Sequence, residues 1–599
     1  MLHNCIGRRR LWPALIIIAA TCSLCAINAH AAQFLEFRAQ RQNNGIAISA
    51  NGTGLMRFRD GALEMGAAER IAATLNAFAM QGGKPDRITV KTINVNACHI
   101  MLDGAVLLTV GQEIARGANS MADPLARGWA DNIRKALAKP YVMLEPRGRM
   151  QVPLGEGRKL RWGGNATADL TFSSENPAVA AVKLDGSGQG LLIEGTGVGA
   201  TTVTAMLGSQ QFTLPVEVKT WAARLKQPVV AEVTYPPLPA DDLRRTLRNA
   251  LLYATEPAPT ASIELGEPRR SGDRYEMQLR ATGRDCFTVD ETVTVILKPV
   301  PSPRQRAQEL LVSNAPERIT EPATLLRERL LGAAPVRLLW HHVNSSNQPV
   351  RFAVRVANVG KTDTRLHVTE AATGPHDDEI YVGHSAMMRY LALTAQGEGY
   401  YLNVPAGRML DLYDTRLSPD KIVSGLATLT PGAGSDLILE VVAENAWPTD
   451  AFFTPIPTRL MNDPPLTPYR FEASKTVELR HEAGGAWTFY HIGKDYSVNL
   501  QGQKLFGDYG VHYSIQATFE NPSDKPAKCE IGLRASGGVA RASVVLNGEL
   551  TETGLLRGSN EQVVYKCELQ PHERKAVTLL TMPESGSNYP LTLTMRSSQ

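Results

Sequence analysis

The chain has 599 residues, a formal net charge of +4, 37 prolines, 50 glycines and only 20% charged residues. At roughly 150 residues a domain, this length predicts about four domains. Three of the positive charges are Arg8, Arg9 and Arg10, so the rest of the chain is nearly neutral. It lacks the concentrated basic face of a nucleic-acid-binding protein. Much proline and glycine with few charges is typical of a β-rich extracellular protein.

The first 31 residues have the pattern of a secretory signal peptide. The three arginines precede an almost wholly apolar stretch, and Ala29 and Ala31 supply small residues at a cleavage site. The alternative is an uncleaved membrane anchor, because the apolar stretch approaches the length of a spanning helix. Pro13 and the small exit residues favour cleavage after Ala31. No later segment is apolar enough to span a membrane, so we expect an exported protein, periplasmic or extracellular, including the cell surface.

Residues 33–141 are predicted to form a small α+β domain. Apolar periodicity indicates helices over 65–81 and 123–137, with Trp129 as a core residue. Alternating segments indicate four strands, at 46–50, 87–90, 97–102 and 105–110. We expect the last three strands to form a meander that the helices cover.

Residues 142–219 contain seven or eight short strands between turn signals, a spacing that predicts a two-sheet β-sandwich. The segment that begins at Phe172 reads FSSENPAVAAV, and the segment from 193 to 205 reads IEGTGVGATTVTA. These motifs resemble the bacterial Ig-like group 2 domain (BIG2), in which a tryptophan often stands where this chain has Phe172. The resemblance implies an Ig-like sandwich. It says little about function, because the family occurs in adhesins, polysaccharide-active enzymes and other secreted proteins.

The remaining chain is predicted to form three further domains. Residues 228–300 combine strands with an amphipathic helix and indicate a second small α+β domain. Residues 335–446 and 469–599 are predicted to be related β-sandwiches, because an alternating strand ends at Asn358 in one and at Asn521 in the other. We expect each asparagine to open a hairpin, and the proline-rich segment 447–468 to be an extended linker. The fold class is therefore mainly β and multidomain, with Ig-like β-sandwiches combined with small α+β domains.

Four cysteines follow the predicted signal peptide. Cys529 and Cys567 lie in strand-like segments of one predicted domain, so they are the favoured disulfide. Whether Cys98 and Cys286 pair is left open, since such a bond would join two domains. None of these four cysteines forms a C-x-x-C spacing with another, which argues against a zinc site.

Two clusters are candidates for binding sites. His376, Asp377, Asp378 and His384 carry groups that could ligate a divalent metal, with His341 and His342 upstream; the alternative, which we favour, is a solvated loop. Trp487, Phe489 and Tyr490 could form an aromatic face that stacks on sugar rings, and the alternative, again favoured, is that they fill a sandwich core.

The sequence contains no catalytic motif of defined spacing and no phosphate-binding loop. We therefore interpret the protein as an exported, non-enzymatic modular protein without a cofactor. It would act as a structural or interaction component, adhesion- or scaffold-like, whose partner is an unidentified protein or glycan. The alternative is a carbohydrate-binding or polysaccharide-processing accessory protein. An enzyme built on the cluster around His376 is a third interpretation.

Overall fold

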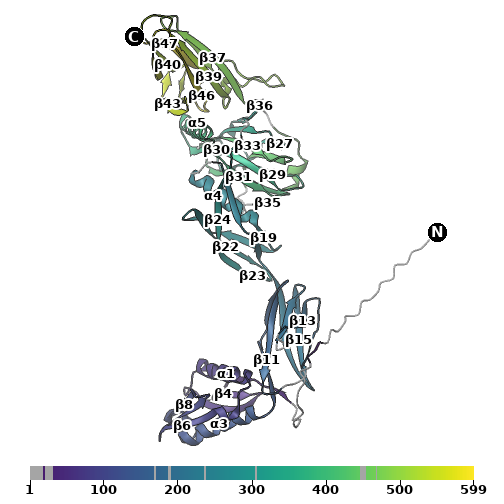
Figure 1. Ribbon diagram of the computed structural model, residues 1–599. Coiled ribbons are helices and arrows are strands. Elements are labelled where there is room, and N and C mark those ends of the chain that lie inside the picture. The colour runs from purple at the N-terminus through teal and green to yellow at the C-terminus, as the bar shows by residue number, and fades with distance from the viewer. Residues whose placement is uncertain are drawn as a thin grey trace, which may run out of the picture. The chain divides into compact units, whose positions relative to one another are not determined.

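The computed structural model describes residues 32–166, 170–186, 190–234, 238–303, 306–445, 453–466 and 469–598, together with the short strand β1 (Ile18–Ala20). The protein is mainly β and multidomain, and it divides into two compact units (Figure 1). The first comprises Met1–Ala222, Ala258–Ala261 and Thr282–Thr288, and the second comprises Ala223–Pro257, Ser262–Ala281 and Val289–Gln599. Apart from β1, which pairs with β12, the predicted signal peptide lies outside the described residues. No described helix is long and apolar enough to span a membrane.

The first unit begins with an α+β domain. Its two antiparallel sheets contain β3 (Phe37–Gln42), β4 (Gly45–Ala50) and β5 (Thr53–Arg59), and β6 (Ile88–Asn94), β7 (Ala97–Leu102) and β8 (Ala105–Val110). Its helices are α1 (Met65–Met80), α2 (Gln112–Gly117) and α3 (Ala122–Ala138). Trp129 on α3 is buried beside Phe58, with ring centroids 4.9 Å apart, so it is a core residue as predicted.

A two-sheet sandwich follows in the same unit. One sheet has the order β1-β12-β15-β16-β10 and the other β13-β14-β11-β9-β2. The strand bounds are β2 (Gln33–Phe34), β9 (Tyr141–Glu145), β10 (Met150–Pro153), β11 (Gly157–Gly164), β12 (Leu170–Ser174), β13 (Ala180–Leu184), β14 (Gly190–Gly195), β15 (Gly199–Leu207) and β16 (Gln210–Trp221). Phe172 is buried in the core, beside the half-buried Trp162. Gly199, where β15 starts, has φ +145°, a conformation that favours glycine.

In the second unit, a single large sheet runs through regions that the sequence assigned to separate domains. Its main path is β20-β22-β24-β18-β31-β30-β33-β28-β25-β36. The first four strands, β20 (Ala261–Leu265), β22 (Arg274–Gly283), β24 (Val289–Pro299) and β18 (Val229–Val233), carry α4 (Ala240–Ala254) and form the predicted α+β region. Val233 of β18 pairs with Tyr400 of β31 (Tyr400–Val404), so the sheet continues into the following sandwich.

The middle sandwich starts earlier than residue 335. Its strands in the large sheet include β25 (Glu309–Ser313), β28 (Val336–Asn344), β30 (Thr364–His376), β33 (Ile422–Pro431) and β36 (Tyr469–Glu472). The facing sheet contains β27 (Ala323–Leu331), β34 (Asp436–Glu444), β29 (Val350–Asn358), β32 (Arg408–Leu417) and β35 (Thr454–Pro455). The boundary at 335 was misplaced because β25 and β27 precede it, and the boundary at 469 because β36 pairs with β25.

The C-terminal sandwich also consists of two sheets. One contains β37 (Ser474–Glu482), β39 (His512–Glu520), β46 (Arg574–Thr581), β42 (Ser543–Leu546) and β43 (Glu549–Glu552). The other contains β38 (Thr488–Ile492), β47 (Leu591–Ser597), β40 (Ala527–Ala535) and β45 (Gln562–Leu569).

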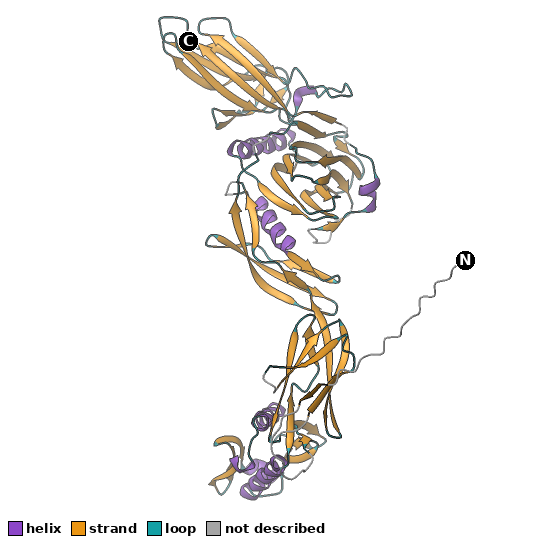
Figure 2. Cartoon of the chain, turned by 45° about the vertical axis from the view of Figure 1, so that its right-hand side comes forward, coloured by secondary structure: helices purple, strands orange, loops and turns teal. Residues whose placement is uncertain are grey.

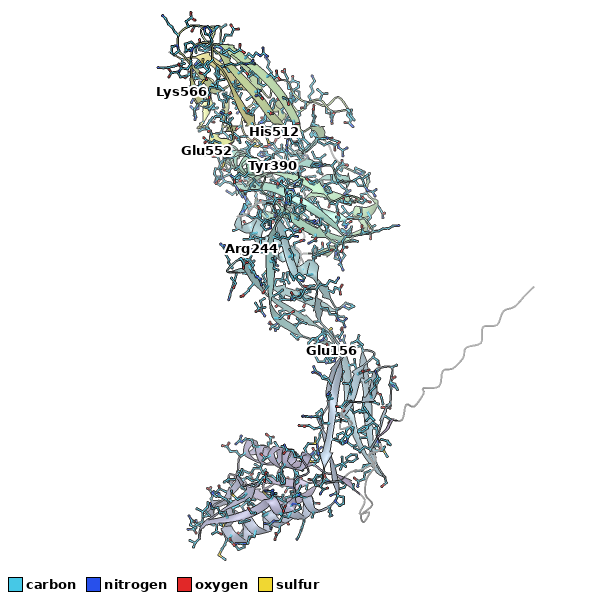
Figure 3. The ribbon with its side chains drawn as sticks, in the orientation of Figure 1. Glu156, Arg244, Tyr390, His512, Glu552 and Lys566 are labelled. Carbon is cyan, nitrogen blue, oxygen red and sulfur yellow. The ribbon has the colours of Figure 1, made fainter. Side chains whose placement is uncertain are left out.

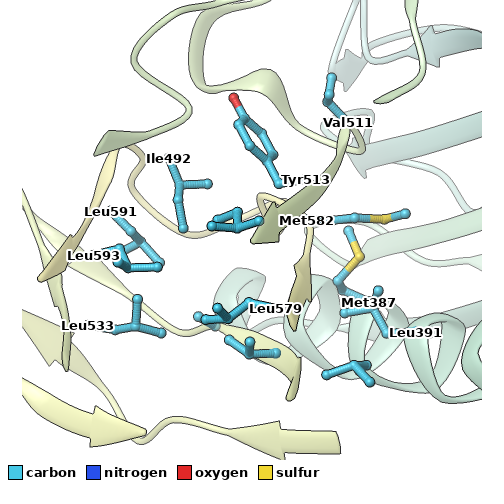
Figure 4. Close-up of a cluster of buried hydrophobic side chains, with 14 of the residues drawn as sticks. Met387, Leu391, Ile492, Val511, Tyr513, Leu533, Leu579, Met582, Leu591 and Leu593 are labelled. Carbon is cyan, nitrogen blue, oxygen red and sulfur yellow. The ribbon is translucent and has the colours of Figure 1, made fainter. Parts of the chain in front are cut away.

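An unpredicted helix joins the two sandwiches of the second unit. Helix α5 (Glu379–Gln396) packs on β30 and β33 of its own sheet and also contacts β42 (Figure 2). Met387 and Leu391 on α5 belong to the same buried apolar cluster as Leu579 and Met582 of the C-terminal sandwich (Figure 4). One hydrophobic core is therefore shared by both sandwiches.

At each of the repeated asparagines the chain crosses from one sheet of a sandwich to the other. The prediction that each asparagine opens a hairpin is therefore wrong. Asn358 ends β29, and the next strand, β30, lies in the opposite sheet; Asn521 lies in the same way between β39 and β40. The Asn358 amide donates to the carbonyls of Thr362 and Val404, and the Asn521 amide to those of Lys525 and Gln570. Asn344 makes a third such crossing, from β28 to β29, which the sequence comparison missed. An alternating strand followed by a turn does not reveal which strand its successor pairs with.

The described part of the predicted linker packs onto the middle sandwich. Strand β35 pairs with β32, Leu466 forms a bridge with Arg327, and Leu460 of α6 (Thr458–Asn462) is buried. Residues 447–452 and 467–468 lie outside the described residues. The extended-linker prediction is wrong for 453–466, because its apolar side chains find partners on the sheet.

Candidate functional site

Of the predicted metal ligands, His376, Asp377 and Asp378 are neighbours before α5, whereas His384 belongs to the buried side of that helix. Asp378 is the N-cap of α5, where its carboxylate accepts a hydrogen bond from the Tyr381 amide at 3.0 Å. Asp377 is exposed and forms an ion pair with Lys421 at 3.1 Å, and the His376 ring packs at a tilt against Tyr381. The solvated-loop interpretation holds for the exposed Asp377 and Asp378, and it is wrong for His384, because a helix begins at Glu379.

His384 instead connects α5 to the C-terminal sandwich. Its Nδ1 lies 2.8 Å from Glu584 and its Nε2 lies 2.8 Å from Glu552, which Figure 3 labels. Glu584 is fully buried, and Arg541 is 3.2 Å from Glu552. Burial alone lowers the pKa of His384, but the hydrogen bonds and charges of the two carboxylates outweigh it and raise that pKa above its usual value. The sequence could not reveal this pairing, because Glu584 is 200 residues away.

This ion pair predicts a pH dependence of stability. A raised folded-state pKa means that His384 stabilises the fold fully below the unfolded pKa of about 6.5, and that this contribution is lost as pH rises through the folded-state pKa. We expect the free energy of unfolding to decrease above neutral pH, and His384→Gln to weaken that decrease. Urea unfolding between acidic and alkaline pH measures it. His572→Gln, at the exposed pair with Asp524, is the control that should leave the slope unchanged; an unchanged slope in His384→Gln would contradict the assignment.

A different trio gathers possible metal ligands. Ligand atoms of Glu317, His341 and Glu379 all lie within 4.8 Å of one another, and Nε2 of His341 is 3.6 Å from Glu379. The nearby His341 ring lowers the pKa of Glu379, although burial opposes it, and the charge of Arg318 lowers that pKa further. The trio offers three ligands to a divalent cation, with the cationic Arg318 close by. Of the predicted histidines only His341 belongs to it; His342 is buried, and burial lowers its pKa to about 3.

The aromatic candidates divide between surface and core. The Trp487 and Phe489 side chains are 54% and 48% exposed, with ring centroids 6.1 Å apart. The guanidinium of Arg596 lies 4.9 Å from the centre of the Trp487 ring. Tyr490 points the other way, toward Tyr513 in the shared core. The prediction that these aromatic side chains fill a sandwich core is confirmed for Tyr490 and is wrong for Trp487 and Phe489.

The four cysteines are free thiols in the structure. Cys529 on β40 lies directly opposite Cys567 on β45, so the favoured pair is in register although the bond is not formed. Burial raises the pKa of the Cys529 thiol to about 11. Cys98 is buried with its thiol 3.7 Å from Asp123, and Cys286 donates to the carbonyl of Arg284, so these two have separate partners.

Two of the cavities lie between elements of neighbouring domains within one unit. In the first unit, an open groove of about 880 Å³ lies between α1 and the sheet of β9 and β11, and Trp162 and Arg147 line it. In the second unit, a cavity of about 360 Å³ is lined from the middle sandwich by Arg337, His367 and Tyr390, and from the C-terminal sandwich by His512. Figure 3 labels Tyr390 and His512.

These features define a modular β protein whose described residues contain several polar contacts between sandwiches. No protein-family model and no curated protein matches the chain. Solved structures that resemble parts of it include domains 5–6 of the S-layer protein SbsC, with 12% identity and a TM-score of 0.12 over 26% of this chain and 95% of that one. Fibronectin(III)-like modules of Clostridium thermocellum CbhA give 13% identity and a TM-score of 0.14 over 26% of this chain and 94% of theirs.

A longer match is the catalytic domain with two CBM51 domains of Clostridium perfringens ZmpB. The match has 8% identity and a TM-score of 0.16, and it covers 81% of this chain and 60% of that one. All three TM-scores are too low to carry an argument about function.

Proposed function

We propose that the protein is an exported, non-enzymatic modular protein that acts as a structural or interaction component at the bacterial cell surface or in the periplasm. The BIG2 resemblance of residues 142–219 is part of this proposal. The observation that carries it is the apolar core shared by α5 and the C-terminal sandwich. Interfaces between domains of one chain are usually polar and permit motion. A continuous hydrophobic core instead holds two sandwiches in one orientation, which suits a spacer or scaffold.

Export and interaction can be tested on cells that produce the full chain. We expect a mature protein that begins at Ala32 in the periplasm, in the medium or at the surface. Photo-cross-linkers at the exposed positions Leu331 and Leu555 should then yield a defined adduct with another envelope component. An intact N terminus in the cytoplasm would contradict export, and exported protein without any adduct from either position would contradict an interaction role at these surfaces.

Export also predicts a disulfide between Cys529 and Cys567. The two residues face each other on antiparallel strands, and an oxidising compartment would let their thiols react. Cys529 is fully buried, so the test is made on unfolded protein. We expect protein isolated from the envelope and unfolded in denaturant to resist alkylation at both positions until it is reduced. A Cys529→Ser/Cys567→Ser variant should lose about 2–4 kcal/mol of stability relative to the oxidised protein. Full alkylation of both thiols without reduction would contradict the prediction.

A second candidate function is carbohydrate binding, which the exposed rings of Trp487 and Phe489 favour. Exposed aromatic rings on a rigid sheet can stack on the apolar faces of sugars. A glycan array with the full chain tests it, and Trp487→Ala should abolish the signal. Phe506→Ala removes an aromatic ring that is 66% exposed elsewhere in the same sandwich, and it should leave the signal intact. Absence of any glycan signal, or equal loss in both variants, would contradict this function.

A further inference from the structure

The cavity of about 360 Å³ in the second unit contains a buried positive charge. Arg337 on β28 is only 5% exposed, and no carboxylate among the described residues lies within 4 Å of its guanidinium. It donates to the carbonyls of Ala473 and Gly510 at 2.6 and 3.2 Å and to the hydroxyl of Tyr390 at 3.3 Å. Neutral acceptors hold the guanidinium in place but do not compensate its charge. A buried cation of this kind favours an anionic partner.

Two histidines line the cavity together with Arg337. Nε2 of His367 is buried without a partner among the described residues, and the His367 side chain lines the cavity. His512 lines it from the C-terminal sandwich and is only 7% exposed. Burial and then the charges of Arg337 and Arg306 lower the pKa of His512 to about 3. Two guanidinium groups therefore act on the His512 position in addition to burial, and both charges would attract an anion.

The remaining lining is rich in hydroxyl groups. Tyr390 and Thr428 contact each other through their hydroxyls at the cavity, and Thr369 and Thr430 also line it. Among the described lining residues Glu398 is the one acid, and burial raises its pKa. Arg306 is exposed and lines the same cavity. The volume falls in the range of small-molecule sites, in which a few polar groups fix an otherwise enclosed ligand.

We propose that this cavity binds a small hydroxylated oxyanion, a molecule with a carboxylate or phosphate group that pairs with Arg337 while its hydroxyls meet Tyr390 and the threonines. Guanidinium groups bind both kinds of oxyanion with paired N–H donors. Because the lining comes from both sandwiches, the ligand would also contact both sides of their interface. This site is independent of the proposed structural function.

Calorimetry with the full chain tests the site, using inorganic phosphate, glucuronate and glucose as probes in matched sodium chloride. We expect binding of phosphate, glucuronate or both, and none of glucose. If phosphate alone binds, the recognised group is a phosphate; if glucuronate alone binds, it is a sugar carboxylate. In protein with isotope-labelled histidine, the ring signals of His367 and His512 should shift as the anion is added. Binding of neither anion at millimolar concentration, or equal binding of glucose, would overturn the proposal.

Two substitutions should change the affinity for the anion in opposite directions. Arg306→Gln removes a positive charge from a solvent-exposed side chain and should weaken anion binding by about three- to tenfold. Glu398→Gln removes the negative charge at constant shape and should strengthen it by a similar factor. Neither side chain is part of the buried core, so both variants should fold. Arg408→Gln, an exposed arginine on the facing sheet, should leave the affinity unchanged. Changes of the same sign in Arg306→Gln and Glu398→Gln would overturn the proposal.

Discussion

Gly383→Ala should destabilise the second unit, although alanine is normally the better helix former. A β-carbon at Gly383 on α5 would lie 1.7 Å from the backbone oxygen of Ser585 in the C-terminal sandwich. Backbone cannot move aside as a flexible side chain does, so the helix and the sandwich must separate. We expect a loss of about 1–3 kcal/mol or more and weaker coupling between the two sandwiches. Urea unfolding of the full chain measures both effects.

Gly128→Ala in α3 is the matched control for this prediction. A β-carbon there would meet nothing within 4 Å, so the ordinary helix preference should apply and stabilise the first unit by about 0.5–1 kcal/mol. Equal stabilisation by both substitutions would show that α5 does not approach Ser585 as closely as described.

Glu440→Ala should be the most damaging single substitution in the facing sheet of the middle sandwich. Glu440 on β34 is fully buried, with its two carboxylate oxygens 2.7 Å from Arg327 and 2.6 Å from Arg355. Both guanidinium groups are also buried. Removing the carboxylate leaves Arg327 with Asp463 at 3.2 Å and Arg355 with Glu444 at 3.3 Å, but it removes the buried partner that the two guanidinium groups share. We expect a cost of about 3 kcal/mol, at the lower end of the range for a broken buried ion pair. Chemical denaturation read out by hydrogen exchange of peptides from β29 and β34 measures this loss.

Asp436→Ala on the same strand is the control. Its partner Arg329 lies 2.6 Å away, but that arginine side chain is 55% exposed and the Asp436 side chain 24%. Solvent screens such a pair, so we expect a change of about 0–1 kcal/mol. If Glu440→Ala lowers the free energy of unfolding no more than Asp436→Ala does, burial is not the reason that the ion pairs of Glu440 stabilise the protein.

The sequence predicted local structure well where side-chain periodicity is strong. Helices α1 and α3 and strands β4, β6, β7 and β8 lie within a few residues of their predicted positions, whereas β3, β5 and α2 were not predicted. Helix α5 was readable too, since Asp378 is a good N-cap and Gly397 ends the helix with φ +69°. The acidic residues after Pro375 were interpreted as a turn instead, and the apolar spacing that follows them was overlooked.

What the sequence could not predict depends on contacts between distant segments. Pairing of β18 with β31, and of β25 with β36, merges regions that composition separates. His384 was selected as a metal candidate, but its partners Glu552 and Glu584 come from another sandwich. Arg337, His367 and His512 carry no motif, and only the fold brings them to one cavity. Trp487 and Phe489 were recognisable as a pair, whereas their exposure depends on which face of β38 the core covers.

The central claim is that the middle and C-terminal sandwiches unfold as one body through their shared core. Pulsed hydrogen exchange of the full chain along a urea series tests it most directly, because peptides from β28 and β39 report separately on the two sandwiches. We predict that both lose protection at the same urea concentration in the unmodified protein, and that Gly383→Ala separates the two midpoints. Distinct midpoints in the unmodified protein would contradict the claim.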